Sequence, residues 1–226
     1  MSSMNSTAFR RVTWLILALL GLACIAGSAK AVAAQPILAL PTPPGERWRV
    51  IQGYGCGTHE GWDYYALDLV SASGMSLGAP VRAAADGTLM AWVEESGTLI
   101  LNHGDQLFTM YTHMEPGGLT QVGLPVQRGQ LIGLVGERGT PGNPHLHFMA
   151  YLADGVYGLD NRRSIPLRFA EGYELPDIGG CNQHSGVALT AAGSAVEREG
   201  FSIVRRAPPH QLEPIYCAGF PHYCRQ

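Results

Sequence analysis

Residues 98–113 read TLILNHGDQLFTMYTH, and this stretch shows most directly how the chain folds. Two runs rich in apolar, β-branched and aromatic residues, 98–102 and 107–113, flank the polar segment NHGD at 102–105. Each run has the length of a strand, and asparagine, glycine and aspartate are residues that tight turns favour. The stretch therefore predicts two neighbouring strands joined by a hairpin turn.

Short runs of the same kind recur through the middle of the chain. They are Tyr64–Val70, Val81–Ala85, Thr88–Val93, Leu131–Val135 and Leu146–Leu152. Asp86-Gly87 separates two of them and is typical of a hairpin turn. No stretch in this region has the 3.6-residue apolar period of a helix, and 29 glycines and 15 prolines suit short strands and tight turns. We therefore expect a mainly β protein with an antiparallel sandwich-like or barrel-like core, and neither a coiled coil nor a helical bundle.

The first 34 residues have the three parts of a secretory signal peptide. Two arginines precede the uncharged apolar run 12–27, and small residues near 33–34 offer cleavage sites. One alternative is an uncleaved membrane anchor, for which the apolar run is short. Another is a lipoprotein signal ending at Cys24, which lacks the aliphatic residue expected three positions earlier. We expect cleavage, a secreted or cell-envelope protein, and no stable membrane association afterwards.

The charge balance argues against polyanionic partners. The chain has 15 basic and 18 acidic residues, a formal net charge of −3. Removal of residues 1–34 takes away three bases and no acid, which changes the net charge from −3 to −6. Proteins that bind nucleic acids usually carry a basic excess or a basic patch, so we expect no nucleic-acid partner.

The character of the sequence divides the remaining chain into three parts. Residues 35–46 form a Pro-rich lead-in, residues 47–152 form the β core, and residues 153–226 form a less regular C-terminal extension. The extension is either packed on the core or a small added unit. A length of 226 residues is enough for one good-sized domain or two small ones.

Four cysteines remain after removal of the signal peptide, and an even number in an exported protein indicates disulfides. Pairing Cys217 with Cys224 would make a local clip and would leave Cys56 to pair with Cys181. Four cysteines allow three pairings, however, and the sequence does not choose among them. No C-x-x-C spacing is present, so a cysteine-based metal site is not expected.

The segment His145-Leu146-His147 is the first candidate for metal chemistry. In a strand, residues i and i+2 point to the same face, so both imidazoles would project together and Leu146 and Phe148 would face the other way. Two neutral imidazoles side by side suit a zinc site. A bare H-x-H is nevertheless more often a pair of unrelated histidines, so the motif needs further support.

A histidine and two aspartates, His59, Asp63 and Asp68, form the second candidate group. Asp68 lies between Leu67 and Leu69 in an otherwise apolar run. A lone carboxylate is costly to bury there unless a cation pairs with it, and a metal ion supplies one. The alternative is an exposed position on the strand.

His113 is the third candidate, because it ends the apolar run 107–113. Alternation along a strand predicts that Tyr111 shares the face of His113. A histidine at a strand end is weak support by itself. His103 lies in a turn, where histidines are common, and we assign it no chemistry.

Taken in order along the chain, these blocks resemble the lysostaphin/LytM family of zinc endopeptidases. The resemblance covers about residues 50–152, roughly half of the chain. Each block is modest alone, whereas all of them in the family order are specific. The blocks are His59…Asp68, APVRAAADG at 79–87, NHGD at 102–105, MYTHM at 110–114, VQRGQLIG at 126–133 and PHLHF at 144–148.

The resemblance implies a role for each candidate residue. His59, Asp68 and His147 would bind one zinc ion per chain, with a fourth position left for water. His113 and His145 would be the catalytic pair that the zinc does not bind. One of them would accept the water proton or stabilise the oxyanion and later protonate the leaving amine.

The identity of the carboxylate ligand is a choice between two aspartates. Many relatives have H-x-G-x-D, which His59 to Asp63 also fits. We favour Asp68, because it lies inside a strand-like run and because its spacing to the next block is closer to the family's. Met149 stands where the family often has glutamate, a position that is not a ligand.

The implied function is a secreted zinc endopeptidase that uses zinc-activated water to hydrolyse peptide bonds of bacterial cell-wall peptidoglycan, in the stem peptide or the cross-bridge. We expect this peptide as the partner and a monomeric enzyme. The alternatives are a non-catalytic relative that binds the wall or regulates another hydrolase, and a secreted protease that acts on proteins. The filled ligand positions favour the enzyme.

Overall fold

The computed structural model describes residues 36–193 of the chain. This range contains fourteen strands and one short 3-10 helix, joined by turns and loops. All pairings between these strands are antiparallel, which confirms the predicted fold class. In chain order the elements are β1 (Arg47–Gln52), η1 (Gly61–Asp63), β2 (Leu67–Ser71), β3 (Pro80–Arg82), β4 (Gly87–Val93), β5 (Thr98–Asn102), β6 (Leu107–Thr112), β7 (Met114–Pro116), β8 (Pro125–Val126), β9 (Leu131–Val135), β10 (Leu146–Asp154), β11 (Asp160–Ile165), β12 (Leu167–Arg168), β13 (Glu174–Leu175) and β14 (Ala188–Thr190).

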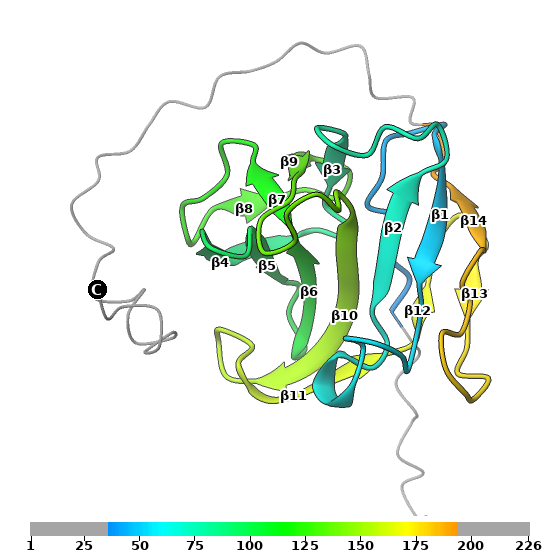
Figure 1. Ribbon diagram of the computed structural model, residues 1–226. Coiled ribbons are helices and arrows are strands. Elements are labelled where there is room, and N and C mark those ends of the chain that lie inside the picture. Colours follow the sequence, from blue (N-terminus) through cyan, green and yellow to red (C-terminus); the bar gives the residue numbers. More distant parts are fainter. Residues whose placement is uncertain (1–35, 194–226) are drawn as a thin grey trace, which may run out of the picture. The chain divides into compact units, whose positions relative to one another are not determined.

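A main sheet of nine strands contains β10 at its centre. The strand order is β14-β1-β2-β10-β6-β5-β4-β8, with β11 also paired to β10. Figure 1 shows that this sheet curves strongly, with β10 and β6 side by side. One edge of β10 pairs with β6, and the other edge pairs first with β2 and then with β11. The strands β3, β9 and β7 form a second sheet, and β12 and β13 form a third.

The apolar runs identified in the sequence all contain strands, but only one of the two predicted hairpins forms. The hairpin at 102–105 is confirmed, because β5 pairs with β6 and Asn102 lies opposite Phe108. The prediction of a hairpin at Asp86-Gly87 is wrong, because the strands on its two sides do not pair with each other. There the chain passes from β3, which pairs with β9, to β4, which pairs with β5 and β8. A local turn signal shows where the chain bends and not which strands pair after the bend.

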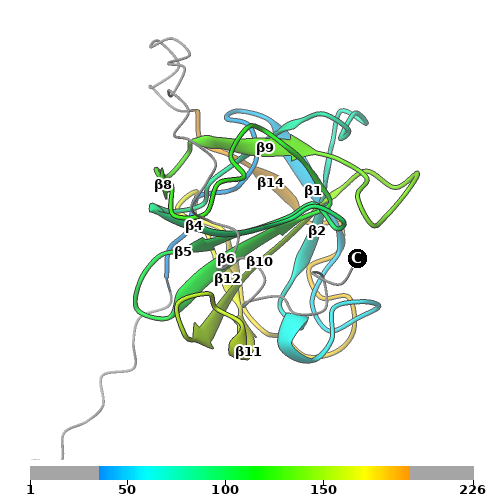
Figure 2. The same ribbon diagram turned by 90° about the vertical axis from the view of Figure 1, so that its left-hand side faces the viewer.

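Two buried apolar clusters lie on opposite faces of the central strands. The larger cluster combines residues of the main sheet, such as Tyr111 and Phe148, with Val81 and Val135 from the second sheet. Figure 2 shows β9 lying over the curved strands β4, β5 and β6. The smaller cluster includes Met149 on the other face of β10. Burying each large apolar side chain stabilises the fold by about 1.5–3 kcal/mol.

The segments on either side of the core region complete the same fold. In the Pro-rich lead-in, Leu38 and Leu40 are buried. The Leu38 amide donates a hydrogen bond of 3.0 Å to the carbonyl oxygen of Arg168. Within residues 153–193, β11 pairs with β10 and β14 pairs with β1. The described part of the C-terminal segment therefore adds strands to the main sheet.

Several predictions concern residues outside the described range. The signal peptide, Cys24 and the cysteines Cys217 and Cys224 all lie within residues 1–35 or 194–226. Within residues 36–193, no helix has the length and apolar character that a membrane crossing requires.

A disulfide joins Cys56 to Cys181, which are 125 residues apart in sequence. This pairing is one of those that the sequence leaves open. It connects the loop after β1 to the segment between β13 and β14.

Loss of this disulfide should destabilise the fold. We expect the double change Cys56→Ser and Cys181→Ser to lower the free energy of unfolding by about 2–5 kcal/mol, because the cross-link restricts the unfolded chain. Denaturant titration of the variant beside the wild type measures the difference. An unchanged midpoint and slope would contradict the expectation.

Candidate active site

His147 in the central strand β10 and His145, the residue just before that strand, line one cavity. Leu146 and Phe148 pack in the larger apolar cluster, whereas His145 and His147 line the cavity on the other side. The predicted alternation is thus confirmed for this segment. In the pairing of β10 with β2, His147 lies directly opposite Asp68.

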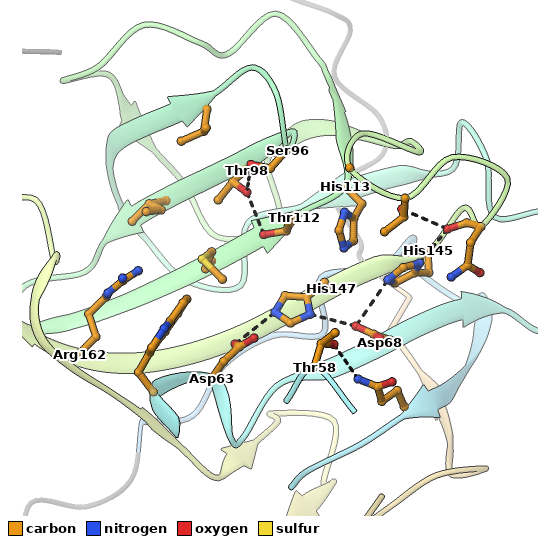
Figure 3. A pocket seen from close by; sticks show the side chains of 18 of the residues that line it. Thr58, Asp63, Asp68, Ser96, Thr98, Thr112, His113, His145, His147 and Arg162 are labelled. Carbon is orange, nitrogen blue, oxygen red and sulfur yellow. Dashed lines mark hydrogen bonds and ion pairs between the residues drawn. The ribbon is translucent and has the colours of Figure 1, made fainter. Parts of the chain in front are cut away.

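His59 and Asp68, from distant parts of the sequence, converge on His147. Figure 3 shows Asp68 beside His147. His59 Nε2 lies 3.2 Å from Asp68 Oδ1 and 3.2 Å from His147 Nδ1, and the latter two atoms are 3.0 Å apart. All three residues are buried. Ligand atoms held tetrahedrally about 2.1 Å from zinc lie about 3.4 Å from one another. The donor types and their spacing therefore fit a zinc ion, and we call these residues the triad.

Backbone contacts fix the orientation of His59. Its Nδ1 lies 2.8 Å from the carbonyl oxygen of Gly53, which can only accept a hydrogen bond, so Nδ1 donates and Nε2 keeps its lone pair. Gly53 is itself held by the C-terminal segment, because its amide donates to Asn182 Oδ1 at 2.8 Å. A Cβ at Gly53 would lie 1.6 Å from the carbonyl oxygen of Gln183, so this close approach requires glycine. With the disulfide at Cys181, residues 181–183 thus brace the loop that carries His59.

The two candidate aspartates occupy different places around His147. Asp68 Oδ1 lies beside Nδ1 of that ring, whereas Asp63 Oδ1 lies 3.2 Å from Nε2, the nitrogen on the far side. The structure therefore places Asp68 within the triad and Asp63 outside it. A carboxylate that accepts the second N–H of a metal-binding histidine fixes the tautomer and orientation of the ring.

The electrostatics of the triad favour positive charge at its centre. Burial by itself raises the pKa of a carboxyl group, but hydrogen bonds with His147 and His59 hold the pKa of Asp68 far below its ordinary value. Burial likewise lowers the pKa of His147, but Asp63 and Asp68 outweigh it and raise that pKa to about 9. Without a metal, the carboxylates thus stabilise a proton on the imidazole. A divalent cation at the same place would take over that role.

A backbone irregularity at the end of β6 determines where His113 points. His113 has a φ of +67°, in the left-handed region that non-glycine residues rarely adopt. This turn breaks the alternation of the strand. His113 and Thr112 both line the cavity, whereas Tyr111 is buried in the larger cluster on the opposite face. The prediction that Tyr111 shares the face of His113 is therefore wrong.

The imidazoles of His113 and His145 lie next to each other beside the triad, with ring centroids 4.6 Å apart. His113 Nδ1 donates to the carbonyl oxygen of Arg138 at 2.7 Å, and His145 Nδ1 donates to that of Asn143 at 2.8 Å. Both rings therefore turn Nε2 away from these carbonyl groups, and Nε2 of His145 lies 3.6 Å from Asp68 Oδ1. Burial lowers the pKa of His113, against the opposing effect of the Arg138 carbonyl. The imidazole is thus neutral near pH 7 and able to accept a proton.

The backbone carbonyl group that orients His113 belongs to Arg138, a residue that the sequence analysis did not identify. Its guanidinium pairs with Glu115 at 2.8 Å and also with Glu94. These three residues come from separate parts of the chain and have no shared motif. Only the folded structure identifies them as a support for His113.

A cavity of about 730 Å³ extends from the triad along the sheet. Figure 3 shows several of the side chains that line it. Its lining includes two residues that the sequence did not single out, Trp62 from η1 and Arg162 from β11. A tryptophan and an arginine in short, irregular segments carry no signal that separates them from ordinary surface residues.

The fold and the site agree with one protein family. Residues 59–157 match Peptidase family M23, and this segment contains all the histidines and aspartates described above. Residues 59–157 of this chain belong to peptidase family M23. The predicted resemblance to the lysostaphin/LytM group is thus confirmed.

Individual relatives match parts of the chain. Peptidoglycan DD-endopeptidase ShyC of Vibrio cholerae is 30% identical over 116 residues, which make up 50% of this chain and 24% of ShyC. Glycyl-glycine endopeptidase ALE-1 of Staphylococcus capitis is 34% identical over 107 residues, 43% of this chain and 28% of ALE-1. The chain thus matches about a quarter of the length of these relatives. Among solved structures, the deep-sea M23 metalloprotease pseudoalterin has a TM-score of 0.50 and 25% identity, covering 66% of this chain and 86% of that one.

Proposed function

We propose that this protein is a zinc endopeptidase that hydrolyses peptide bonds in bacterial cell-wall peptidoglycan. One observation carries the proposal. Three donor atoms 3.0–3.2 Å apart form a zinc-sized triad, and two further histidines lie beside it in the same cavity. A purely structural zinc site is closed by four protein ligands, whereas a catalytic site has three and keeps one position open.

In this proposal, His59, Asp68 and His147 hold the ion. A zinc ion bound there supplies Lewis-acid chemistry, which lowers the pKa of a water molecule and polarises the scissile carbonyl group. Asp63 accepts a hydrogen bond from Nε2–H of His147. This bond fixes the tautomer of the ring and keeps the lone pair of Nδ1 directed into the triad.

The proton transfers fall to His113 and His145. Each has its Nδ1 proton engaged by a backbone carbonyl, so Nε2 is the atom that acts. Between them these atoms accept the proton of the attacking water, hydrogen-bond to the developing oxyanion and protonate the leaving amine. Held by their carbonyl partners, the two rings need little rearrangement during the reaction.

The proposed substrate and location rest on the relatives and on the sequence. The matched proteins are named as peptidoglycan and glycyl-glycine endopeptidases. Peptidoglycan lies outside the cytoplasmic membrane, which agrees with the proposed signal peptide at residues 1–34. All of the site residues belong to one chain, so we infer that a monomer contains a complete site.

Digestion of purified peptidoglycan tests the function directly. We expect the mature protein to release peptide fragments, to lose this activity in the presence of a zinc chelator and to regain it when zinc is added back. Product masses identify the bond that is cut. The His147→Ala variant is the matched control, and activity or zinc content unchanged in that variant would contradict the proposal. Protein that contains zinc but leaves peptidoglycan intact would favour a non-catalytic relative, and cleavage of proteins alone would favour a general protease.

A further inference from the structure

Arg162 lines the part of the cavity away from His145. Figure 3 shows Arg162 beyond Asp63 and His147, on the opposite side from His145. The reason lies in the sheet: β11, which carries Arg162, continues along the same edge of β10 where β2 ends. In the register of β10 and β11, Arg163 lies opposite Leu152, five residues beyond His147, so the backbone of Arg162 lies well along the strand from the triad.

The guanidinium of Arg162 lies against Trp62, and within residues 36–193 it has no acidic partner. It lies 3.9 Å from the centroid of the Trp62 ring. Within residues 36–193, no hydrogen bond or ion pair engages Arg162, although five other arginine and histidine side chains have carboxylate partners there. Its acidic neighbour in the cavity lining, Asp63, is engaged by His147.

This arrangement suits a carboxylate ligand. A guanidinium whose face lies on an aromatic ring still presents its N–H groups along the edge, and their spacing matches the two oxygens of a carboxylate. Arg162 is the single lysine or arginine among the residues that line the cavity. The Trp62 ring covers one face of the guanidinium and leaves its edge open to the cavity.

We propose that Arg162, supported by Trp62, binds a free carboxylate of the peptide substrate at a subsite several residues from the scissile bond. This inference rests on the proposed function for the position of that bond. The carboxylate is either the C-terminal one of a peptide strand or an acidic side chain. Because the subsite is distant from the triad, it acts on substrate binding and KM and leaves kcat nearly unchanged.

Peptide binding by a chain that does not turn over tests the subsite. The probe is a synthetic cross-linked dimer of the wall stem peptide in four forms: both carboxylate types free, the C-terminal ones amidated, the side-chain ones amidated, or both amidated. Calorimetry uses zinc-loaded protein carrying His113→Ala, so that the peptide is not consumed. Arg162→Gln removes the charge, and Arg162→Lys keeps the charge without the planar fork. Arg163→Gln is the matched control, because Arg163 is the next residue of β11 and is exposed.

We expect the free form to bind about tenfold to a hundredfold more tightly than the fully amidated form. Arg162→Gln should abolish this preference, Arg162→Lys should restore part of it, and Arg163→Gln should retain it. The two singly amidated forms identify which carboxylate is bound. Equal binding of all four forms, no measurable binding of the free form, or a preference that survives Arg162→Gln would overturn the proposal.

Hydrolysis of the same dimers, measured with His113 intact, separates the two proposals. Tight, Arg162-dependent binding without cleavage would preserve the subsite and reject the proposed function. Cleavage that does not depend on the carboxylates would support the proposed function and reject the Arg162 subsite. If Arg162 only stacks on Trp62 for stability, its change should lower the melting temperature and leave the ratio between peptide forms unaffected.

Discussion

The His113→Ala variant is expected to retain its full complement of zinc and to hydrolyse peptidoglycan peptides about 100-fold to 10,000-fold more slowly. His113 is not part of the triad, so its removal leaves the three donor atoms in place. Its neutral imidazole, held by the carbonyl group of Arg138, is the group placed to exchange protons beside the triad. The expected loss is therefore in kcat, with metal content unchanged.

Metal analysis and steady-state kinetics on the same preparation check this expectation. The control variant is His103→Ala, because the His103 side chain bonds to Asp86 and Thr109 and does not line the cavity. It should keep both zinc and activity. Full activity in His113→Ala would remove the proposed role, and loss of zinc in that variant would show that His113 supports the metal site itself.

The sequence predicted the fold class from local patterns, and it predicted the triad from the ordered blocks that resemble a known family. Strand-length apolar runs marked the strands, and alternation along one strand correctly brought His145 and His147 to one face. Asp68 was favoured over Asp63 because it lies in a strand-like run and because its spacing to the next block resembles that of the family, and β2 does carry it to a place opposite His147. The strands could be recognised within a few residues, whereas the site needed the order of blocks spread over residues 50–152.

The positions that sequence reasoning missed depend on contacts between distant segments or on backbone conformation. The positive φ of His113 is set by the packing around the end of β6, where its amide donates to the carbonyl oxygen of Ser96 at 3.0 Å. No period in the sequence reveals such a turn, and Tyr111 was therefore assigned to the wrong face. Arg138 and Arg162 become significant only through their partners, which lie far away in the chain.

Zinc binding by matched aspartate variants should distinguish the two carboxylates. We expect Asp68→Ala to weaken zinc binding by well over 100-fold, because it removes one of three ligands and leaves two buried imidazoles without their anion. Asp63→Ala should weaken zinc binding only about 10-fold to 100-fold, the usual effect of losing an outer carboxylate that orients a histidine.

Competition with a chromophoric chelator measures both affinities, and circular dichroism verifies that each variant is folded. The two aspartates contact opposite nitrogens of the same imidazole, so they form a controlled pair: similar charge, similar surroundings and different access to Nδ1. The reverse order of effects would make Asp63 the ligand. Equal and small effects would mean that the ion does not lie between His59 and His147 at all. The proposed zinc-dependent hydrolysis would then be rejected, because His113 and His145 would face a cavity without a metal.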